Sequence, residues 1–143
     1  MNKKAENFKA YLKTQKVTCF AIDEIKNDAM NTVAFRSYMD VAGRRLETLV
    51  LCDSTIYTMI RVRVFPKALS AKNEAKLRKQ IDMLNGTYKI LKFYLSPEGD
   101  LVLDVTIPAP AGTVDGDMIF TMMDVIIRNL ETEYEKLAEV IGR

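Results

Sequence analysis

Two pairs of carboxylates have the spacing that acid–base or metal chemistry requires. Asp100 and Asp104 lie four residues apart in a predicted strand, so their side chains face the same side. Glu131 and Glu135 lie one turn apart on a predicted helix. Such pairs act as proton donors or metal ligands only where further groups converge on them. We identify no converging group, and we expect all four to be solvated surface carboxylates.

The sequence contains no histidine. Histidine is the commonest general base near neutral pH and a common transition-metal ligand. Without it the chain cannot form a Ser–His or Cys–His nucleophile pair, and its two cysteines cannot build an ordinary structural zinc site. We therefore predict a protein that is not an enzyme and that carries no cofactor or metal.

Nothing in the sequence is typical of an exported or membrane-spanning protein. Residues 1–16 carry five lysines and no apolar segment of the kind found in secretory signals. No run of 18 apolar residues occurs. Cys19 and Cys52 are expected to be buried, reduced thiols. These features predict a cytoplasmic protein with no membrane association.

Residues 56–65 alternate more clearly than any other segment and predict a strand that ends at Pro66. One face is apolar, and the other mixes aromatic side chains, a methionine and arginines: Tyr57, Met59, Arg61, Arg63 and Phe65. This composition suits a protein interface. It also suits stacking and charge contacts with single-stranded nucleic acid. Alternatively, the arginines pair with the acidic C-terminal helix or are simply solvated.

Charge is segregated along the chain although the net charge is only +2. Residues 61–92 carry nine basic and two acidic side chains, or +7, whereas residues 93–143 carry three basic and ten acidic ones, or −7. Segregation of this kind indicates either internal neutralisation or an anionic partner. Nucleic-acid binding by the basic region 57–92 is therefore one alternative function.

The segment "DMIFTMMDVII" (117–127) opens a predicted helix that is apolar on more than one side. One stripe, from Ile119 to Ile141, is expected to lie on a sheet. The second apolar side needs another cover, either a helix of the same chain such as residues 3–16 or a second subunit or client. The residues of this proposed interface are Met118, Phe120, Met122, Val125 and Ile127.

The predicted elements follow an α+β order in a single domain of 143 residues. Hairpin connections imply one antiparallel sheet packed with helices. The run 46–52 is apolar enough to predict a strand covered on both faces. The predicted elements are a helix at 3–16, strands at 17–25, 32–41, 46–52 and 56–65, a helix capped by Ser70 and ending at Gly86, and strands at 89–95 and 100–107. A long helix follows, capped by Asp115 or Asp117, running to about Ile141 and ended by Gly142.

Several of these segments resemble the YbjN family, bacterial proteins described as sensory transduction regulators. They are "IYTMIRVRVF" (56–65), "KLRKQIDMLNGTYKILKFYLSPEGDLVLDVTIP" (76–108) and the helix opening "DMIF" (117–120). The resemblance covers about residues 17–141. It implies the fold of type III secretion chaperones, α-β-β-β-α-β-β-α, here with a possible extra N-terminal strand. Those chaperones are homodimers that hold partially unfolded clients, and the resemblance supplies no catalytic residue.

Three functions are compatible with these observations. The first is a non-enzymatic protein-binding module, chaperone-like or regulatory, that forms a homodimer and binds a protein client. The second is nucleic-acid binding through 57–92, which must weaken steeply as salt rises. The third, a small enzyme or metabolite binder, requires a pocket in which polar groups converge.

Overall fold

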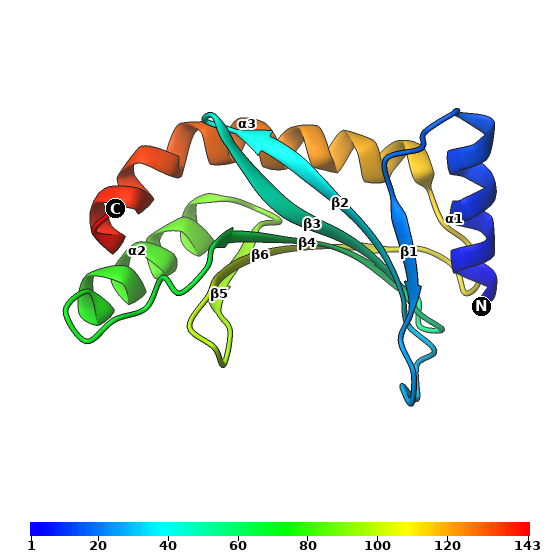
Figure 1. Cartoon of the computed structure of the whole chain (residues 1–143), viewed down its shortest axis with the longest axis horizontal. Coiled ribbons are helices and arrows are strands. Elements are labelled where there is room, and N and C mark those ends of the chain that lie inside the picture. The colour runs from blue at the N-terminus through cyan, green and yellow to red at the C-terminus, as the bar shows by residue number, and fades with distance from the viewer.

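A six-stranded antiparallel sheet and three helices make up the chain in a computed structural model that describes residues 1–143 (Figure 1). The fold is therefore α+β, as predicted. The elements are α1 (Lys3–Thr14), β1 (Ala21–Glu24), β2 (Val33–Val41), β3 (Arg44–Cys52), β4 (Tyr57–Phe65), α2 (Glu74–Thr87), β5 (Lys92–Leu95), β6 (Leu101–Pro108) and α3 (Gly116–Ile141).

The strands lie in the order β1-β2-β3-β4-β6-β5, and every neighbouring pair is antiparallel. The tightest connection joins β2 to β3 through Ala42 and Gly43, which have φ values of 50° and 74°. Two consecutive residues with positive φ match the right-handed twist of the paired strands, and glycine adopts that conformation at little cost. This turn fixes the register of the hairpin from Val41 opposite Arg44 to Val33 opposite Cys52.

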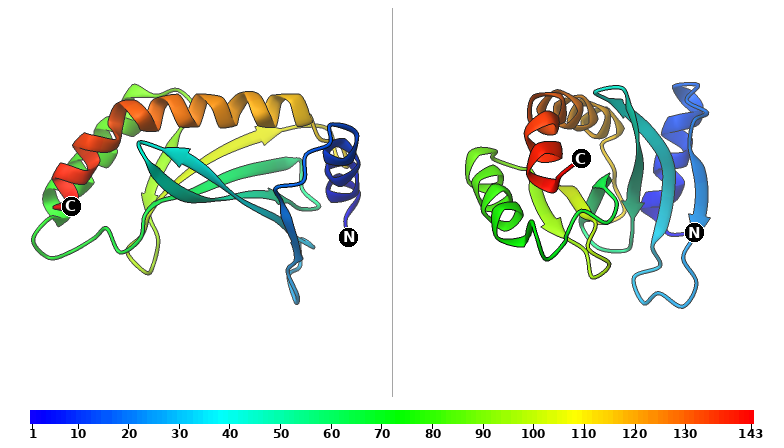
Figure 2. Two further views of the ribbon diagram at one scale, coloured as in Figure 1. Left: turned by 45° about the horizontal axis from the view of Figure 1, so that its top comes forward. Right: turned by 60° about the vertical axis from the view of Figure 1, so that its left-hand side comes forward.

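The two faces of the sheet differ because all three helices lie on one of them (Figures 1 and 2). Side chains of this inner face pack with the helices into one hydrophobic core, which contains Phe8, Phe35, Ile60, Leu103 and Ile126. No helix lies over the opposite face, which we call the open face. Its side chains include Ala34, Arg36, Tyr38, Glu47, Leu49, Leu51, Tyr57, Met59, Arg61, Arg63, Lys92, Tyr94, Val102 and Asp104.

Helix α3 runs along the inner face with defined ends. The side chain of Asp115 accepts a hydrogen bond from the Met118 amide at 3.0 Å, and Gly142 closes the helix with a φ of 96°. Both ends agree with the prediction. The 26 residues extend over about 39 Å. The buried side chains recur at helical spacing and form the core-facing stripe: Ile119, Ile126, Leu130 and Leu137.

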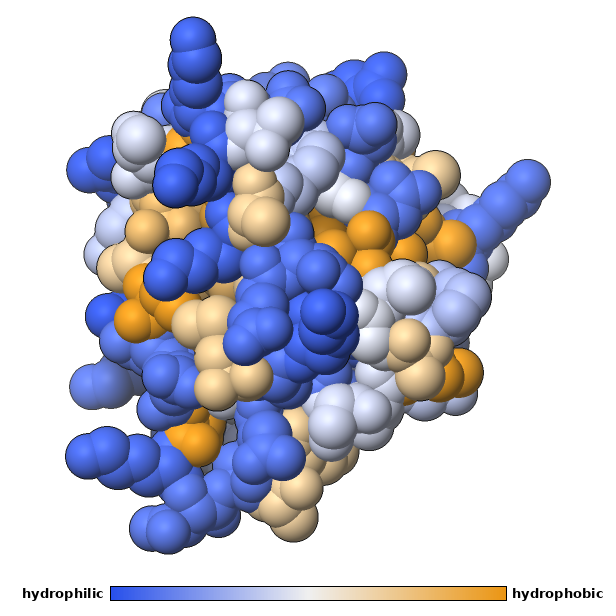
Figure 3. All heavy atoms as spheres, turned by 90° about the vertical axis from the view of Figure 1, so that its right-hand side faces the viewer, coloured by the Kyte–Doolittle hydropathy of each residue, from blue (hydrophilic) through white to orange (hydrophobic).

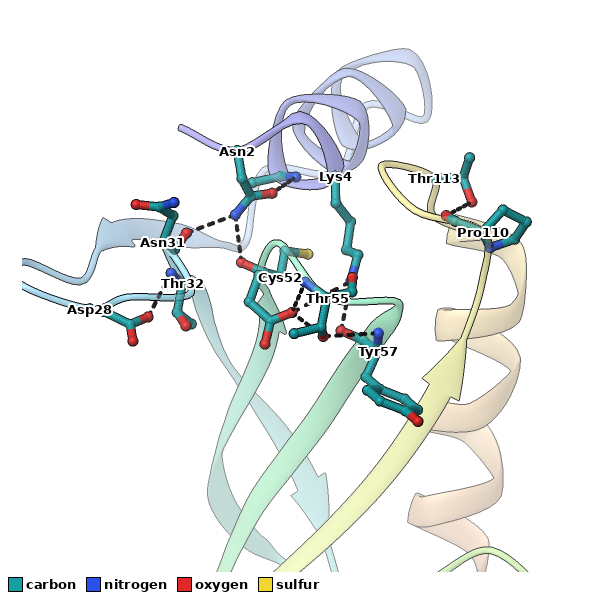
Figure 4. A network of polar contacts seen from close by, with 12 residues as sticks. Asn2, Lys4, Asp28, Asn31, Thr32, Cys52, Thr55, Tyr57, Pro110 and Thr113 are labelled. Carbon is teal, nitrogen blue, oxygen red and sulfur yellow. Dashed lines mark hydrogen bonds and ion pairs between the residues drawn. The ribbon is translucent and has the colours of Figure 1, made fainter.

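Helix α1 is held to the turn between β3 and β4 by a buried lysine (Figure 4). The Nζ of Lys4 donates to the carbonyls of Thr55 at 2.7 Å and Tyr57 at 2.6 Å. Asp53 lies 3.8 Å away and partly offsets the burial that lowers the pKa of Lys4. Asn2 caps α1 and also donates to the carbonyl of Cys52 at 2.9 Å. These bonds tie α1 to the end of β3, the start of β4 and the turn between them.

Several predicted boundaries were wrong. The strand predicted at 17–25 is confirmed only as the four-residue β1, an exposed edge strand. Helix α2 begins at Glu74 rather than after Ser70, because Ser70 and Asn73 bond each other in the preceding turn. Strand β5 begins at Lys92 instead of residue 89. Cys52 is buried as expected, but Cys19 is exposed, and both thiols are free.

Candidate functional site

The open face is built around β4, where four of the five predicted side chains do share one side. Tyr57 is 49% exposed, Met59 and Arg61 are half-buried, and Arg63 is exposed. The alternation predicted from the sequence is confirmed for these residues. A role for them in binding stays a prediction.

Phe65 does not belong to this face, and its predicted placement was wrong. The register with β6 shifts between Arg63 and Phe65, so that one extra residue of β4 is inserted there. A bulge of this kind turns the following side chain to the other side of the sheet. Phe65 is therefore buried and stacks on Tyr134 of α3 with 4.7 Å between ring centroids.

A fixed ion pair crosses the open face between β4 and β6. Arg61 donates from Nε and Nη2 to the two carboxylate oxygens of Asp104 at 2.9 and 3.0 Å. The Tyr94 hydroxyl donates to the same carboxylate at 3.0 Å. The hydrogen bond to Asp104 raises the pKa of Arg61, and burial followed by the charge of Asp104 raises the pKa of Tyr94. Both groups therefore keep their protons at neutral pH.

The predictions for the charged side chains near β4 need two corrections. Asp104 is only 2% exposed and is not a solvated carboxylate, because β5 and β4 flank it on both sides. The arginines do not pair with the acidic C-terminal helix. Arg63 instead pairs with Glu47 of β3 and lies 3.8 Å from Asp100.

Apolar side chains lie beside these ion pairs in the middle of the open face. Leu51 is opposite Met59 and Leu49 is opposite Arg61 in the β3–β4 ladder. Leu49, Leu51 and Met59 are half-buried, which leaves part of each side chain accessible. The sequence predicted the run 46–52 to be covered on both faces, and this was wrong for the open face. A continuous apolar run gives no signal of which side lacks a helix.

The start of α3 has a cover from the same chain on one of its two flanks. Phe120 packs against Tyr11 of α1 and Phe20, with ring centroids 6.2 and 6.3 Å away. The Tyr11 hydroxyl donates to Asp117 at 2.6 Å, and this bond raises the pKa of Tyr11 to about 12. Ile127 also packs against the core. The sequence left open whether a helix of the same chain or a separate partner covers this segment. For Phe120 the cover is α1 of the same chain.

The other flank of α3 is only partly covered. Met118 is 42% exposed, and Met122 and Val125 are half-buried. These three side chains follow one another at helical spacing on the same side of α3. Seen from the α1 end, the molecule is mainly hydrophilic, with apolar side chains in separate patches (Figure 3). Of the interface residues predicted on α3, Met118, Met122 and Val125 therefore form the part that no other element of the chain fully covers.

The basic residues between 57 and 92 do not gather on one surface. Arg61 and Arg63 lie on the open face and are ion-paired. Arg78 pairs with Glu74 at 3.0 Å on α2, which belongs to the layer on the inner face. Lys76 and Lys79 line a hollow together with acidic side chains of α2 and α3. This spread does not favour a continuous basic groove for a nucleic-acid backbone.

Comparison with protein families and with curated proteins found no match to this chain. The resemblance to the YbjN family therefore stays a prediction. None of the three helices combines the length and the apolar character needed to cross a membrane. No three carboxylate or thiol side chains come together as potential metal ligands.

Proposed function

We propose that this chain is a non-enzymatic protein-binding module, chaperone-like or regulatory, that binds its partner through the open face of the sheet. One observation carries the proposal. All three helices pack on the inner face, and the open face presents accessible apolar side chains beside arginines that are already held in place.

The chemistry of this surface favours a protein partner. Tyrosine, methionine and arginine are enriched at the centres of protein interfaces. Tyr57, Met59 and Arg61 supply all three types along one strand. Two hydrogen bonds to Asp104 already hold the guanidinium group of Arg61 in one position. Little side-chain entropy is therefore lost when a partner packs on Arg61.

The partner that we test first is a second copy of the chain. The YbjN-like segments and the element order support a relation to type III secretion chaperones, with β1 as the extra strand. Such a relation implies a homodimer that holds a protein client. The stripe of exposed Met118 and half-buried Met122 and Val125 on α3 is a further surface available to either partner.

The experiment compares Met59→Asp with Met83→Asp. Met83 is 53% exposed on α2, away from the open face, so it controls for the loss of an accessible methionine. Sedimentation velocity from low to high micromolar concentration measures self-association. Affinity capture with quantitative mass spectrometry, from cells that express each variant, measures client binding. Circular dichroism confirms that both variants are folded.

We expect a dimer or a captured protein to be lost in Met59→Asp and retained in Met83→Asp. A wild-type chain that is monomeric throughout and captures no protein above background would contradict the proposal. Equal loss in both variants would show that the open face is not the binding surface.

A further inference from the structure

A hollow of about 380 Å³ lies where the β2–β3 hairpin, the end of β4 and the end of α3 meet. Figures 1 and 2 show the hairpin tip beside α3 and the C-terminal end of α3 bending down alongside α2. A volume of this size is within the usual range for small-molecule sites, roughly 300–1,000 Å³. The hollow is separate from the centre of the open face.

Three arginines line this hollow, and none of them forms an ion pair. Arg44 and Arg45 come from the first two positions of β3, and Arg143 follows α3. Arg143 donates to the carbonyl of Lys67 at 3.0 Å, which holds its side chain across one side of the hollow. Arg45 borders the hollow at the start of β3, but its side chain lies on the open face, where the guanidinium stands over the Tyr38 ring, 4.9 Å from its centroid. No acidic side chain lines the hollow.

Two other charged hollows of the molecule already contain their counter-charges. The one beside Arg61 and Arg63 includes Glu47 and Asp100 in its lining. The one between α2 and α3 sets three lysines beside Asp82 and Glu139. The arginine hollow is different, because no acidic side chain is among its lining residues.

Aromatic and aliphatic side chains form the wall between the arginines. Phe65 and Tyr134 stack with planes 26° apart. Because Phe65, Leu46 and Val64 are almost fully buried, the accessible apolar surface comes mainly from Tyr134, Ala138 and Pro66. Phe65 reaches this position only because of the bulge in β4. The hollow therefore combines an apolar wall with the guanidinium groups of Arg44 and Arg143 at its rim.

We propose that this hollow binds a small organic oxyanion, a phosphate or carboxylate carried on an apolar or aromatic body. Guanidinium groups match the geometry of both anions and form paired, charge-assisted hydrogen bonds with them. The half-buried ring of Tyr134, held in place by its stacking on Phe65, provides the surface against which the body of the ligand packs. This inference does not depend on the proposed protein-binding function.

The test is a titration followed by ¹H–¹⁵N NMR with three probes: phenyl phosphate, benzoate and phenol. We expect saturable shifts in the hollow with the two anions and none with phenol. Inorganic phosphate, added separately, is expected to bind more weakly than phenyl phosphate, because it cannot contact the aromatic wall. Residues on the open face, such as Met59, are expected not to shift.

Two single variants, Arg44→Gln and Arg143→Gln, test the role of the arginines. Each is expected to weaken phenyl phosphate binding about tenfold or more, as the loss of a charge-assisted hydrogen bond does. The matched control is Arg128→Gln, an exposed arginine of α3 that forms no ion pair and lies outside the hollow. Thermal unfolding of each variant checks that the fold is retained.

Absence of saturable shifts throughout the millimolar range would overturn the proposal. So would equal affinity in the wild type, Arg44→Gln and Arg143→Gln, or an equal loss in Arg128→Gln. Equal binding of phenyl phosphate and inorganic phosphate would contradict the role of the aromatic wall.

Discussion

The ring of Tyr11 lies directly over Gly116, so that a Cβ atom at Gly116 would come within 2.5 Å of three ring carbons. This contact seats α1 on the first turn of α3 and brings Tyr11 to Asp117 and Phe120. A glycine is needed here for the close approach of a neighbouring ring and not for its φ value. The cover over the start of α3 therefore depends on the smallest side chain in that turn.

Gly116→Ala is expected to destabilise the fold by roughly 1–3 kcal/mol, because the ring or the helix must move to relieve the overlap. Urea unfolding measures the change. The matched control is Gly86→Ala in α2, where an added Cβ meets nothing within 4 Å. That substitution is expected to be neutral or to stabilise by up to about 1 kcal/mol. Similar destabilisation by both substitutions would contradict the role of the Tyr11 contact.

Lys4→Met is expected to cost roughly 2–4 kcal/mol. The methionine fills similar space but leaves the carbonyls of Thr55 and Tyr57 without their donor. Lys9→Met, at an exposed position of the same helix, is the control and is expected to have an effect below about 0.5 kcal/mol. Denaturant unfolding gives both values. Hydrogen exchange at the β3–β4 turn should accelerate only in Lys4→Met.

Asp104→Asn is expected to weaken the fold by roughly 1–3 kcal/mol, because Arg61 then has no counter-charge in a half-buried position. The magnitude is discounted for the solvent that reaches the arginine. The comparison is Glu74→Gln, which removes the exposed i,i+4 pair with Arg78. We expect that change to cost about 0.5 kcal/mol or less. Equal effects in urea unfolding would show that the Asp104 pair is no more important than a surface pair.

The buried Cys52 predicts a stability change at alkaline pH. Burial raises the pKa of this thiol from 9.0 to about 12. Above pH 9 the unfolded chain loses the proton while the folded chain keeps it, so stability falls as the pH rises from about 9 to about 12. The measurement is the free energy of unfolding at several pH values for the wild type and Cys52→Ala. The advantage of the wild type should shrink with rising pH, and an advantage that grows would contradict the burial of the thiol.

Local patterns predicted the parts of the fold that short segments determine. The alternation of 56–65 followed by Pro66 placed β4, and Asp115 and Gly142 marked the ends of α3. The same alternation correctly predicted that Arg61 and Arg63 lie on one face of β4. Each of these features depends on residues within one or two turns or on strict alternation.

The errors concern positions that distant parts of the chain decide. Phe65 changes face because β4 gains a residue against β6, and its new position is stabilised by Tyr134. Lys4 is buried because the β3–β4 turn, some fifty residues away, presents two carbonyls to it. Asp104 is enclosed by both of its neighbouring strands. A single sequence contains no local signal for any of these contacts.

The inserted residue in β4 makes a single strand contribute to two separate surfaces, the open face and the arginine hollow. Before it, Tyr57, Met59, Arg61 and Arg63 point away from the helices, and after it Phe65 points towards them and lines the arginine hollow. Without the insertion, the aromatic ring would join the arginines outside and leave Tyr134 without its stacking partner. A mutation before the inserted residue can therefore alter the open face while the arginine hollow keeps its shape, and a mutation after it can do the reverse. The two surfaces can diverge independently during evolution.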